Sequence, residues 1–322
     1  MKQPIGGYFE WEFPPAKREQ LHENAVLLNS CRNALQYILE RLPKITKLWI
    51  PYFTCEVILE PLKRLGVPYE FYHVNSNLEL AQETSLDKDE FLVYTNYYGI
   101  KDDYVKALTT RYGDHLIIDN AQALFSSPIT GSHQIYSPRK FIGMPDGGLA
   151  VTPLQDDSAS LPQDVSYDRC AHLLKRIDLH PTQGYADFQK DDDSISGKPV
   201  SRMSLISRKI FESVNLESIR QRRRENFKIL HDSLGSTNKL PMPALQSFSC
   251  PLVYPYWSHD SGLKKKLIAN NVFVATYWPN VLEWTKPSDL EYELASNVVC
   301  LPIDQRYGED EMNFIINEVN NV

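Results

Sequence analysis

The chain has 322 residues and a formal net charge of −7, from 34 basic and 41 acidic side chains. Apolar residues make up 42% of it and charged residues 23%, which excludes a disordered or fibrous protein. The acidic balance argues against a nucleic-acid-binding protein, because such proteins present a basic face. The length favours one large domain followed by a smaller one.

The N-terminal segment and the cysteines indicate the compartment. We expect no signal peptide, because the first residues lack an apolar core, and no membrane span, because no stretch approaches 18 apolar residues. The five cysteines lie far apart and form no C-x-x-C pair, which excludes a zinc ribbon and fits a reducing environment. The sequence therefore predicts a cytoplasmic protein without a metal site.

Strand and helix patterns alternate along the first half of the chain. An apolar run at 25–29 is followed by Ser30, a candidate N-cap, and by helical spacing of apolar residues over 31–42. The patterns that follow predict, in order, a strand at 45–50, a helix at 55–65 ending at Gly66, strands at 68–73 and 91–95, a helix at 102–112 ending at Gly113, and strands at 115–118 and 148–152. This alternation predicts a parallel sheet with right-handed crossovers.

The second half is less regular. Residues 154–200 predict a long, partly helical excursion, and helical spacing returns at 204–234 as a linking helix. A stretch rich in Pro and Ser at 236–251 precedes a small α+β unit. That unit contains apolar runs at 272–278 and 298–303 and a final helix near 309–320. We therefore expect a large domain over 1–235, which includes an N-terminal arm, and a small C-terminal domain over 236–322.

Two charged clusters have simple structural interpretations. The arginines at 220, 222, 223 and 224 lie in a helical pattern beside Glu217 and Glu225, which predicts a solvated helix face. The run Asp191-Asp192-Asp193 is interpreted as an exposed loop rather than a metal site.

The ends of the predicted strands indicate where a ligand binds. Parallel sheets bind ligands beyond the carboxyl ends of their strands, so the residues that follow each strand should meet in one crevice. These are Ser30, Pro51–Cys55, Asn96–Gly99 and Asp119–Gln122. The glycine-rich motifs for dinucleotides and ATP are absent, and so is the nucleophile elbow G-x-S-x-G.

Three of these features together predict a pyridoxal 5'-phosphate (PLP) site. The helix that starts after Ser30 offers backbone N–H groups to a phosphate. Asp119, at the end of a strand, can keep a pyridine nitrogen protonated. Lys140 lies seven residues before Gly147, where a Gly-Gly pair leads into a strand, and its amine can bond the cofactor and move protons.

Several motifs then carry a family resemblance over nearly the whole length. They are Gly6-Gly7-Tyr8, NSCRNAL (29–35), IPYFTC (50–55), YTNYYG (94–99), IIDNAQAL (117–124), SPRKFIGMPDGG (137–148), SRMS (201–204) and VVCLPID near the C-terminus. In this order they resemble those of the DegT/DnrJ/StrS sugar aminotransferases. The resemblance implies an α/β protein of PLP-dependent transferase fold type I, with a mostly parallel central sheet flanked by helices and a smaller C-terminal α+β domain.

The resemblance also implies roles for residues around the cofactor ring. Lys140 would be the Schiff-base lysine, and Asp119 would pair with the pyridine nitrogen. Gln122 would contact the phenolic oxygen, and Cys55 takes the position that packs on the ring face. Each of these residues also has a purely structural interpretation, as a cap, a turn residue or a surface side chain.

The phosphate contacts match the family less well. Ser30-Cys31-Arg32 would bind the phosphate through backbone and hydroxyl groups. The family's serine five residues before the lysine is Ile135 here, so Ser137 is expected to serve instead. The family's asparagine that reaches the neighbouring subunit's phosphate is Val200 here, and Ser201 and Arg202 are the candidate replacements.

The resemblance implies a PLP-dependent aminotransferase. It would transfer an amino group from an amino acid, such as glutamate, to a keto-sugar nucleotide for polysaccharide or glycoconjugate biosynthesis. We expect a homodimer with shared active sites and small-molecule substrates, with no nucleic acid or membrane partner. The alternative is a PLP-binding regulator or scaffold of the same fold without turnover.

Overall fold

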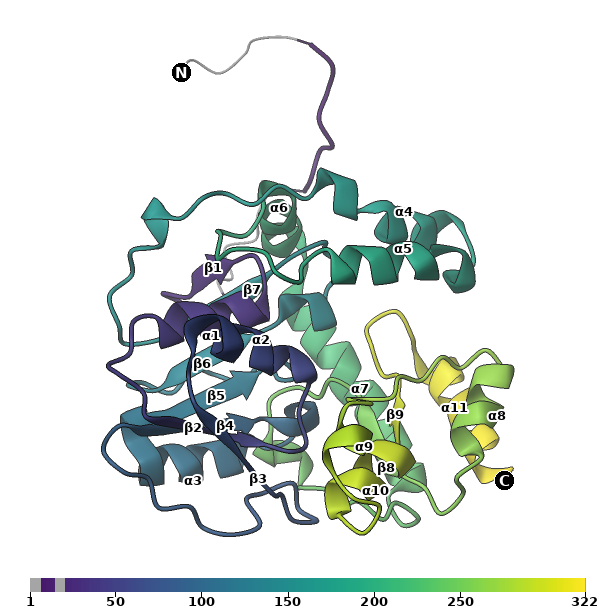
Figure 1. Ribbon diagram of the computed structural model, residues 1–322. Coiled ribbons are helices and arrows are strands. Elements are labelled where there is room, and N and C mark those ends of the chain that lie inside the picture. Colours follow the sequence, from purple (N-terminus) through teal and green to yellow (C-terminus); the bar gives the residue numbers. More distant parts are fainter. Residues whose placement is uncertain (1–6, 15–20, 322) are drawn as a thin grey trace.

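The computed structural model describes residues 7–14 and 21–321, and its centre is a seven-stranded sheet (Figure 1). The strands lie in the order β1-β7-β6-β5-β4-β2-β3. Their bounds are β1 (Val26–Leu28), β2 (Lys47–Pro51), β3 (Tyr69–Tyr72), β4 (Glu90–Thr95), β5 (Leu116–Asn120), β6 (His133–Tyr136) and β7 (Gly148–Val151). Strands β2 to β6 run parallel, and β7 runs antiparallel to both of its neighbours. The mostly parallel sheet that the sequence predicted is confirmed.

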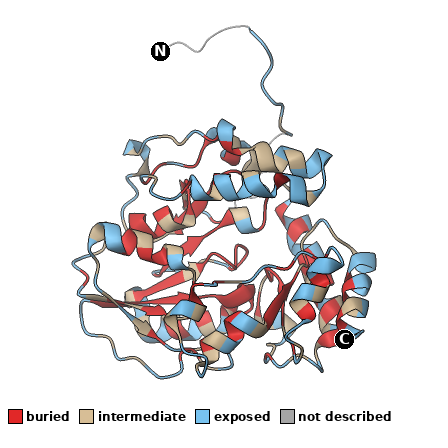
Figure 2. Cartoon of the chain, turned by 45° about the vertical axis from the view of Figure 1, so that its right-hand side comes forward, coloured by how far each residue is buried: buried red, intermediate tan, exposed pale blue. Residues whose placement is uncertain are grey.

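Helices cover both faces of this sheet. The helices are α1 (Cys31–Leu39), α2 (Leu59–Leu65), α3 (Asp102–Tyr112), α4 (Ala171–Asp178), α5 (Pro181–Asp193), α6 (Leu205–Ser213), α7 (Leu216–Leu234), α8 (Leu263–Ala269), α9 (Val281–Trp284), α10 (Leu290–Asn297) and α11 (Glu309–Asn320). Along β4, Val93 packs with the apolar side chains of α1 and α2, whereas Leu92 and Tyr94 pack with those of α3 and α7. The alternation follows from the two-residue period of a strand, and it buries the sheet on both sides (Figure 2).

Most of the predicted elements of the first half are confirmed within a few residues, but one strand was missed. Gly66 and Gly113 end α2 and α3 with positive φ angles of 66° and 56°. The missed strand is β6, with the sequence His-Gln-Ile-Tyr, whose four residues are all buried between β5 and β7. Polar residues give it no apolar pattern, and its place in the sheet depends on its two neighbours.

The second half differs more from the prediction. The predicted linking helix is two helices, α6 and α7, and Asn215 caps the second by accepting a hydrogen bond from the Ser218 N–H. The apolar run at 272–278 is not a strand and makes a single bridge, from Ala275 to Cys300. Strand β9 (Val298–Leu301) pairs instead with β8 (Tyr254–Trp257), whose first three residues are buried.

The excursion at 154–200 contains a helical hairpin, α4 and α5, which lies above the sheet in Figure 1 and is largely exposed in Figure 2. The prediction of an exposed loop at Asp191–Asp193 is wrong, because these residues form the last turn of α5. Asp191 is buried and accepts a hydrogen bond from His172 Nδ1 at 2.7 Å. The three aspartates show no apolar helical pattern, and the end of α5 is held by a hydrogen bond to a residue of another helix, His172 of α4.

The two ends of the chain complete the molecule. Helix α7 lies between the large sheet and the C-terminal elements, where α11 packs on α7 and α8 (Figure 1). At the other end, residues 7–14 extend away from the body, with Tyr8 and Phe9 exposed. Gly6 of the first motif lies outside the described residues. No helix in the described part of the chain is long and apolar enough to cross a membrane.

Candidate active site

A cavity of about 190 Å³ lies at the carboxyl ends of β2, β4, β5 and β6, beside the start of α1. It contains eight of the nine residues that the sequence predicted for the site: Ser30, Cys31, Arg32, Cys55, Asp119, Gln122, Ser137 and Lys140. The ninth, Arg202, does not line it. The parallel strands explain the convergence, because their ends meet at one edge of the sheet.

The first turn of α1 forms one end of the cavity. Ser30 is the N-cap, as predicted, and its Oγ accepts a hydrogen bond from the Asn33 N–H at 3.1 Å. The N–H groups of a first helical turn have no partner within the helix, so Cys31 and Arg32 offer theirs to an anion. The Arg32 guanidinium is already occupied, at 2.6 Å from Glu60 and 2.8 Å from Ser196. Arg32 can therefore serve an anion through its backbone more readily than through its side chain.

Gly148 allows β7 to approach this helix start closely. A Cβ atom on Gly148 would lie 2.2 Å from the carbonyl carbon of Ser30 and 2.5 Å from the Cys31 nitrogen. Its neighbour Gly147 has a φ of 139° and donates its N–H to the Asn29 carbonyl at 3.0 Å. The Gly-Gly pair thus fixes the position of the first turn of α1 relative to the sheet.

Asp119 and Lys140 bring opposite charges to the same cavity. Asp119 lies near the end of β5, where its Oδ1 accepts the Ala121 N–H at 2.8 Å. Burial raises the pKa of Asp119, and the nearby Lys140 ammonium partly offsets that rise. Lys140 ends the short 3-10 helix η4 (Pro138–Lys140), which is separated from β6 by Ser137 alone. The carboxylate is therefore placed where a second cation would stabilise it further.

Gln122 carries an unused hydrogen-bond donor. Its Oε1 accepts the Tyr98 N–H at 2.6 Å, which fixes the orientation of the amide. Its Nε2 is buried and, among the described residues, has no hydrogen-bond partner. A buried donor without a partner costs about 1–3 kcal/mol. The position therefore favours a ligand that offers an acceptor.

One predicted segment supports the site without lining it. Residues 96–99 lie behind Gln122, so the prediction that they join the crevice is wrong. A Cβ atom on Gly99 would lie 2.6 Å from the Gln122 carbonyl oxygen. The cavity is lined instead by Thr95, the last residue of β4.

Two further lining residues were not found in the sequence. Trp278 closes the cavity from the C-terminal half, with a φ of 61° and its ring edge-on to Phe53 at 4.8 Å. Arg139 precedes Lys140, and its Nη1 lies 3.0 Å from Asp192 of α5. The sequence offered no pattern for Trp278, because its partners lie about 200 residues away.

Arg202 lies on an outer segment. It is exposed, and its backbone pairs with Leu28 of β1 and with Gln163. The side chain therefore does not serve the cavity of its own chain.

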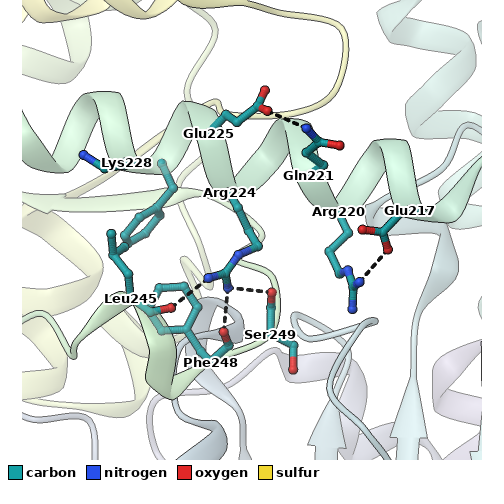
Figure 3. Close-up of a pocket in the computed structure, with 10 residues that line it drawn as sticks. Glu217, Arg220, Gln221, Arg224, Glu225, Lys228, Leu245, Phe248 and Ser249 are labelled. Carbon is teal, nitrogen blue, oxygen red and sulfur yellow. Dashed lines mark hydrogen bonds and ion pairs between the residues drawn. The ribbon is translucent and has the colours of Figure 1, made fainter.

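A second cavity, of about 530 Å³, lies beside α7 but contains none of these groups (Figure 3). Arg224 donates to the carbonyls of Leu245, Phe248 and Ser249, and Arg220 pairs with Glu217 at 2.5 Å (Figure 3). The prediction of a solvated helix face at this basic run is wrong for Arg223, which is buried and donates to the Leu252 carbonyl at 2.8 Å. Arg220 and Lys228 form ion pairs with Glu217 and Asp232, and the donors of Arg224 are engaged by the three carbonyls, so we do not take this cavity as a second candidate site.

Known proteins match this chain in their structures but not in the sequence comparisons. No protein-family profile and no curated protein matches the sequence. Solved structures match over 93% of the chain. The chain has the fold of sugar aminotransferases. This is PLP-dependent transferase fold type I, as the sequence predicted.

Three of these structures show how similar the fold is. One is a DegT DnrJ EryC1 StrS aminotransferase from Brucella abortus (16% identity, 86% of that chain, TM-score 0.61). Another is DesI in the presence of its TDP-sugar product (15% identity, 80% of that chain, TM-score 0.64). The third is Spr1654 from Streptococcus pneumoniae in its PLP form (14% identity, 87% of that chain, TM-score 0.66).

Proposed function

We propose that the protein is a PLP-dependent aminotransferase that moves an amino group from an amino acid, such as glutamate, to a keto-sugar nucleotide. The observation that carries this proposal is one cavity containing Lys140, Asp119 and the unpaired amide nitrogen of Gln122 at a helix start. The TDP-sugar product of DesI and the PLP form of Spr1654 support the substrate and the cofactor. Polysaccharide or glycoconjugate synthesis would use such a product.

The described residues fit PLP group by group. The N–H groups of Cys31 and Arg32 and the hydroxyl of Ser137 would bind the phosphate. Asp119 would bind the protonated ring nitrogen, which is a cation suited to a buried carboxylate. The free Nε2 of Gln122 would donate to the phenolic oxygen.

Each side chain then has a defined part in the reaction. The bound cofactor supplies an electron sink for the negative charge that develops on the substrate carbon. Asp119 would keep the ring nitrogen protonated. The Lys140 amine would take the proton from the substrate carbon that carries the amino group and deliver it to the cofactor carbon bonded to the same nitrogen. Cys55 and Trp278 pack against this space and exclude water. Over two half-reactions one water supplies the carbonyl oxygen of the keto acid formed from the donor, and the acceptor's carbonyl oxygen leaves as one water.

We also propose a cytoplasmic homodimer whose two sites are shared between chains. Arg202 is exposed and lies outside its own cavity, so it is free to reach the phosphate of a partner chain. The apolar side chains of Tyr8 and Phe9 are 100% and 93% exposed on an arm that extends from the body, and a partner would cover them. The all-thiol state of the five cysteines fits a reducing compartment. The two predicted domains, 1–235 and 236–322, belong to the same proposal.

Borohydride reduction of the protein mixed with PLP tests the function. Reduction should fix one cofactor per chain on Lys140, and peptide mass spectrometry should locate it there. The Lys140→Ala variant should carry no such adduct and should form no 2-oxoglutarate from glutamate. Lys106→Ala is the matched control, because this lysine is 67% exposed on α3 and its ion pair is with Asp103, away from the cavity. An adduct at another lysine would overturn the role of Lys140. Failure of the wild-type protein to carry any adduct and to form 2-oxoglutarate from glutamate would overturn the aminotransferase proposal.

A further inference from the structure

One buried acidic residue close to the candidate active site has no part in the proposed reaction. Asp146 directly precedes the Gly-Gly pair at 147–148, is fully buried and does not line the cavity. Burial raises the pKa of Asp146, and hydrogen bonds from serine side chains partly oppose that rise. A buried charge is unfavourable unless the fold supplies partners for it. The partners of Asp146 therefore indicate what this carboxylate holds together.

The Asp146 carboxylate is bound by an arginine and a serine. Its Oδ2 accepts hydrogen bonds from Arg169 Nη2 at 3.1 Å and from the Ser204 N–H at 3.3 Å, and its Oδ1 accepts the Ser204 hydroxyl at 3.0 Å. The backbone N–H of Asp146 donates to Ser207 Oγ at 3.2 Å. Because Ser204 is the N-cap of α6, these contacts tie Asp146 to the first turn of that helix.

Arg169 is itself held in the interior. It is 3% exposed, and its Nη2 also donates to Asp164 at 3.0 Å. Its Nε and Nη1 have no hydrogen-bond partner within the described residues. Loss of the Asp146 charge would therefore leave the guanidinium with Asp164 alone. Because desolvation offsets the attraction in a buried ion pair, a gain in stability does not by itself explain why the fold contains this one.

Hydrogen bonds connect Asp146 to the start of α1 in a closed ring. The N–H of the next residue, Gly147, donates to the Asn29 carbonyl at 3.0 Å, and the Asn29 N–H donates to the Ser201 carbonyl at 2.9 Å. Three residues further along the same segment, Ser204 returns to the Asp146 carboxylate. Asn29 directly precedes the N-cap of α1. A shift of Asp146 relative to Ser204 would therefore move the helix start whose N–H groups face the cavity.

We propose that Asp146, paired with Arg169, is a positioning residue for the cofactor phosphate. It touches neither the phosphate nor the ring. It fixes the 201–204 segment against the Gly-Gly turn, and this sets the place of the first-turn N–H groups of α1. The effect is confined to the phosphate end, because the groups that face the ring follow the ends of β5 and β6. This inference rests on the proposed function for the identity of the ligand.

A comparison of PLP with pyridoxal, which lacks the phosphate, isolates this effect. Both aldehydes can bond Lys140, so the ratio of their affinities in absorbance titrations measures what the phosphate contributes. Asp146→Asn should weaken PLP binding about tenfold or more and leave pyridoxal binding unchanged, because donors to a phosphate must be placed within a fraction of an ångström. The phosphorus NMR resonance of bound PLP should shift in the same variant. Arg169→Gln should act likewise, and the double variant should lose little more, because the pair acts as a unit.

Two further variants keep the test decisive. Ser207→Ala removes the acceptor of the Asp146 N–H without changing a charge, so it should lower the ratio in the same direction even if Asp146→Asn does not fold. Glu291→Gln is the matched control, because Glu291 is also a buried acid, 1% exposed, and accepts the Val74 N–H at 2.7 Å outside the cavity. The control should lower the melting temperature and keep the wild-type ratio.

The outcomes separate this inference from the proposed function. If the wild type binds PLP more tightly than pyridoxal, and Asp146→Asn or, where that variant does not fold, Ser207→Ala keeps the ratio, the positioning role is wrong. An equal fall in both affinities, or the same change of ratio in Glu291→Gln, would also overturn it, because either would show a general loss of structure. If the wild type attaches neither aldehyde to Lys140, the proposed function fails and the positioning role falls with it.

Discussion

Replacing Gly148 by alanine tests whether the close approach of β7 to α1 builds the phosphate end of the site. The added Cβ would lie 2.2 Å from both the carbonyl carbon and the oxygen of Ser30, and 2.5 Å from the Cys31 nitrogen. Contacts below 3.0 Å essentially never occur for real Cβ atoms, and the obstructing atoms here belong to the backbone. The helix start and the strand must therefore separate by about 1 Å.

Two effects should follow from that separation. Overpacking of a tight interior costs about 1–3 kcal/mol, and a backbone obstacle places this case at or above the upper value. A loss of about 3 kcal/mol should lower the melting temperature of the cofactor-free protein by roughly 4 °C, because the entropy of unfolding of a 322-residue chain is large. A displacement of about 1 Å at a positioning group can also reduce turnover about 100-fold, so PLP affinity and amino transfer should fall together.

Thermal unfolding and PLP titration measure these two effects separately. Gly143→Ala is the matched control, because its Cβ would meet only the Leu173 Cδ2 atom at an ordinary 3.5 Å. The control should keep the wild-type melting temperature and PLP affinity. If Gly148→Ala also kept both, the close approach would have no part in forming the site.

Three other predictions concern charge. Burial lowers the pKa of His22 to about 4, so the protein should lose stability as the pH falls from 6.5 toward 4. In His22→Gln this pH-dependent loss should be smaller by up to about 3 kcal/mol. Urea titrations across this pH range measure the difference. Burial raises the pKa of Asp119, so the cofactor-free protein should lose stability as the pH rises from 3.8 through the raised pKa. Asp119→Asn should therefore melt at a higher temperature than the wild type at pH 7 without PLP. The same variant should lose amino transfer by orders of magnitude, and near-wild-type transfer would contradict the role of Asp119. Arg202→Ala should weaken PLP retention about tenfold or more. If the sites are shared, mixing Arg202→Ala chains with Lys140→Ala chains should restore activity. Proven subunit exchange without recovery of activity would refute sharing.

The sequence by itself determined the elements whose cause is local. Ser30 starts α1 because its own hydroxyl accepts the Asn33 N–H, and Gly66 ends α2 because a glycine adopts the positive φ that the turn needs. Strand and helix periods alternate along the first half, so the parallel sheet could be predicted. The parallel order in turn brought Asp119 to the carboxyl edge of the sheet, whereas Lys140 follows β6, the strand that the sequence did not predict.

Only the tertiary structure decided the features that depend on distant partners. Strand β6 exists because β5 and β7 supply hydrogen bonds on both sides of it, and its own four residues show no strand pattern. Trp278 lines the cavity although it lies more than 130 residues beyond Lys140, and the buried Arg223 donates a guanidinium hydrogen bond to the Leu252 carbonyl. The spacing of apolar residues along the sequence indicates which face of a helix or strand is buried. It does not indicate which polar groups form hydrogen bonds with residues far away in the sequence. That pairing sets the walls of the site, because a buried donor or charge is stable only where the folded chain supplies its complement.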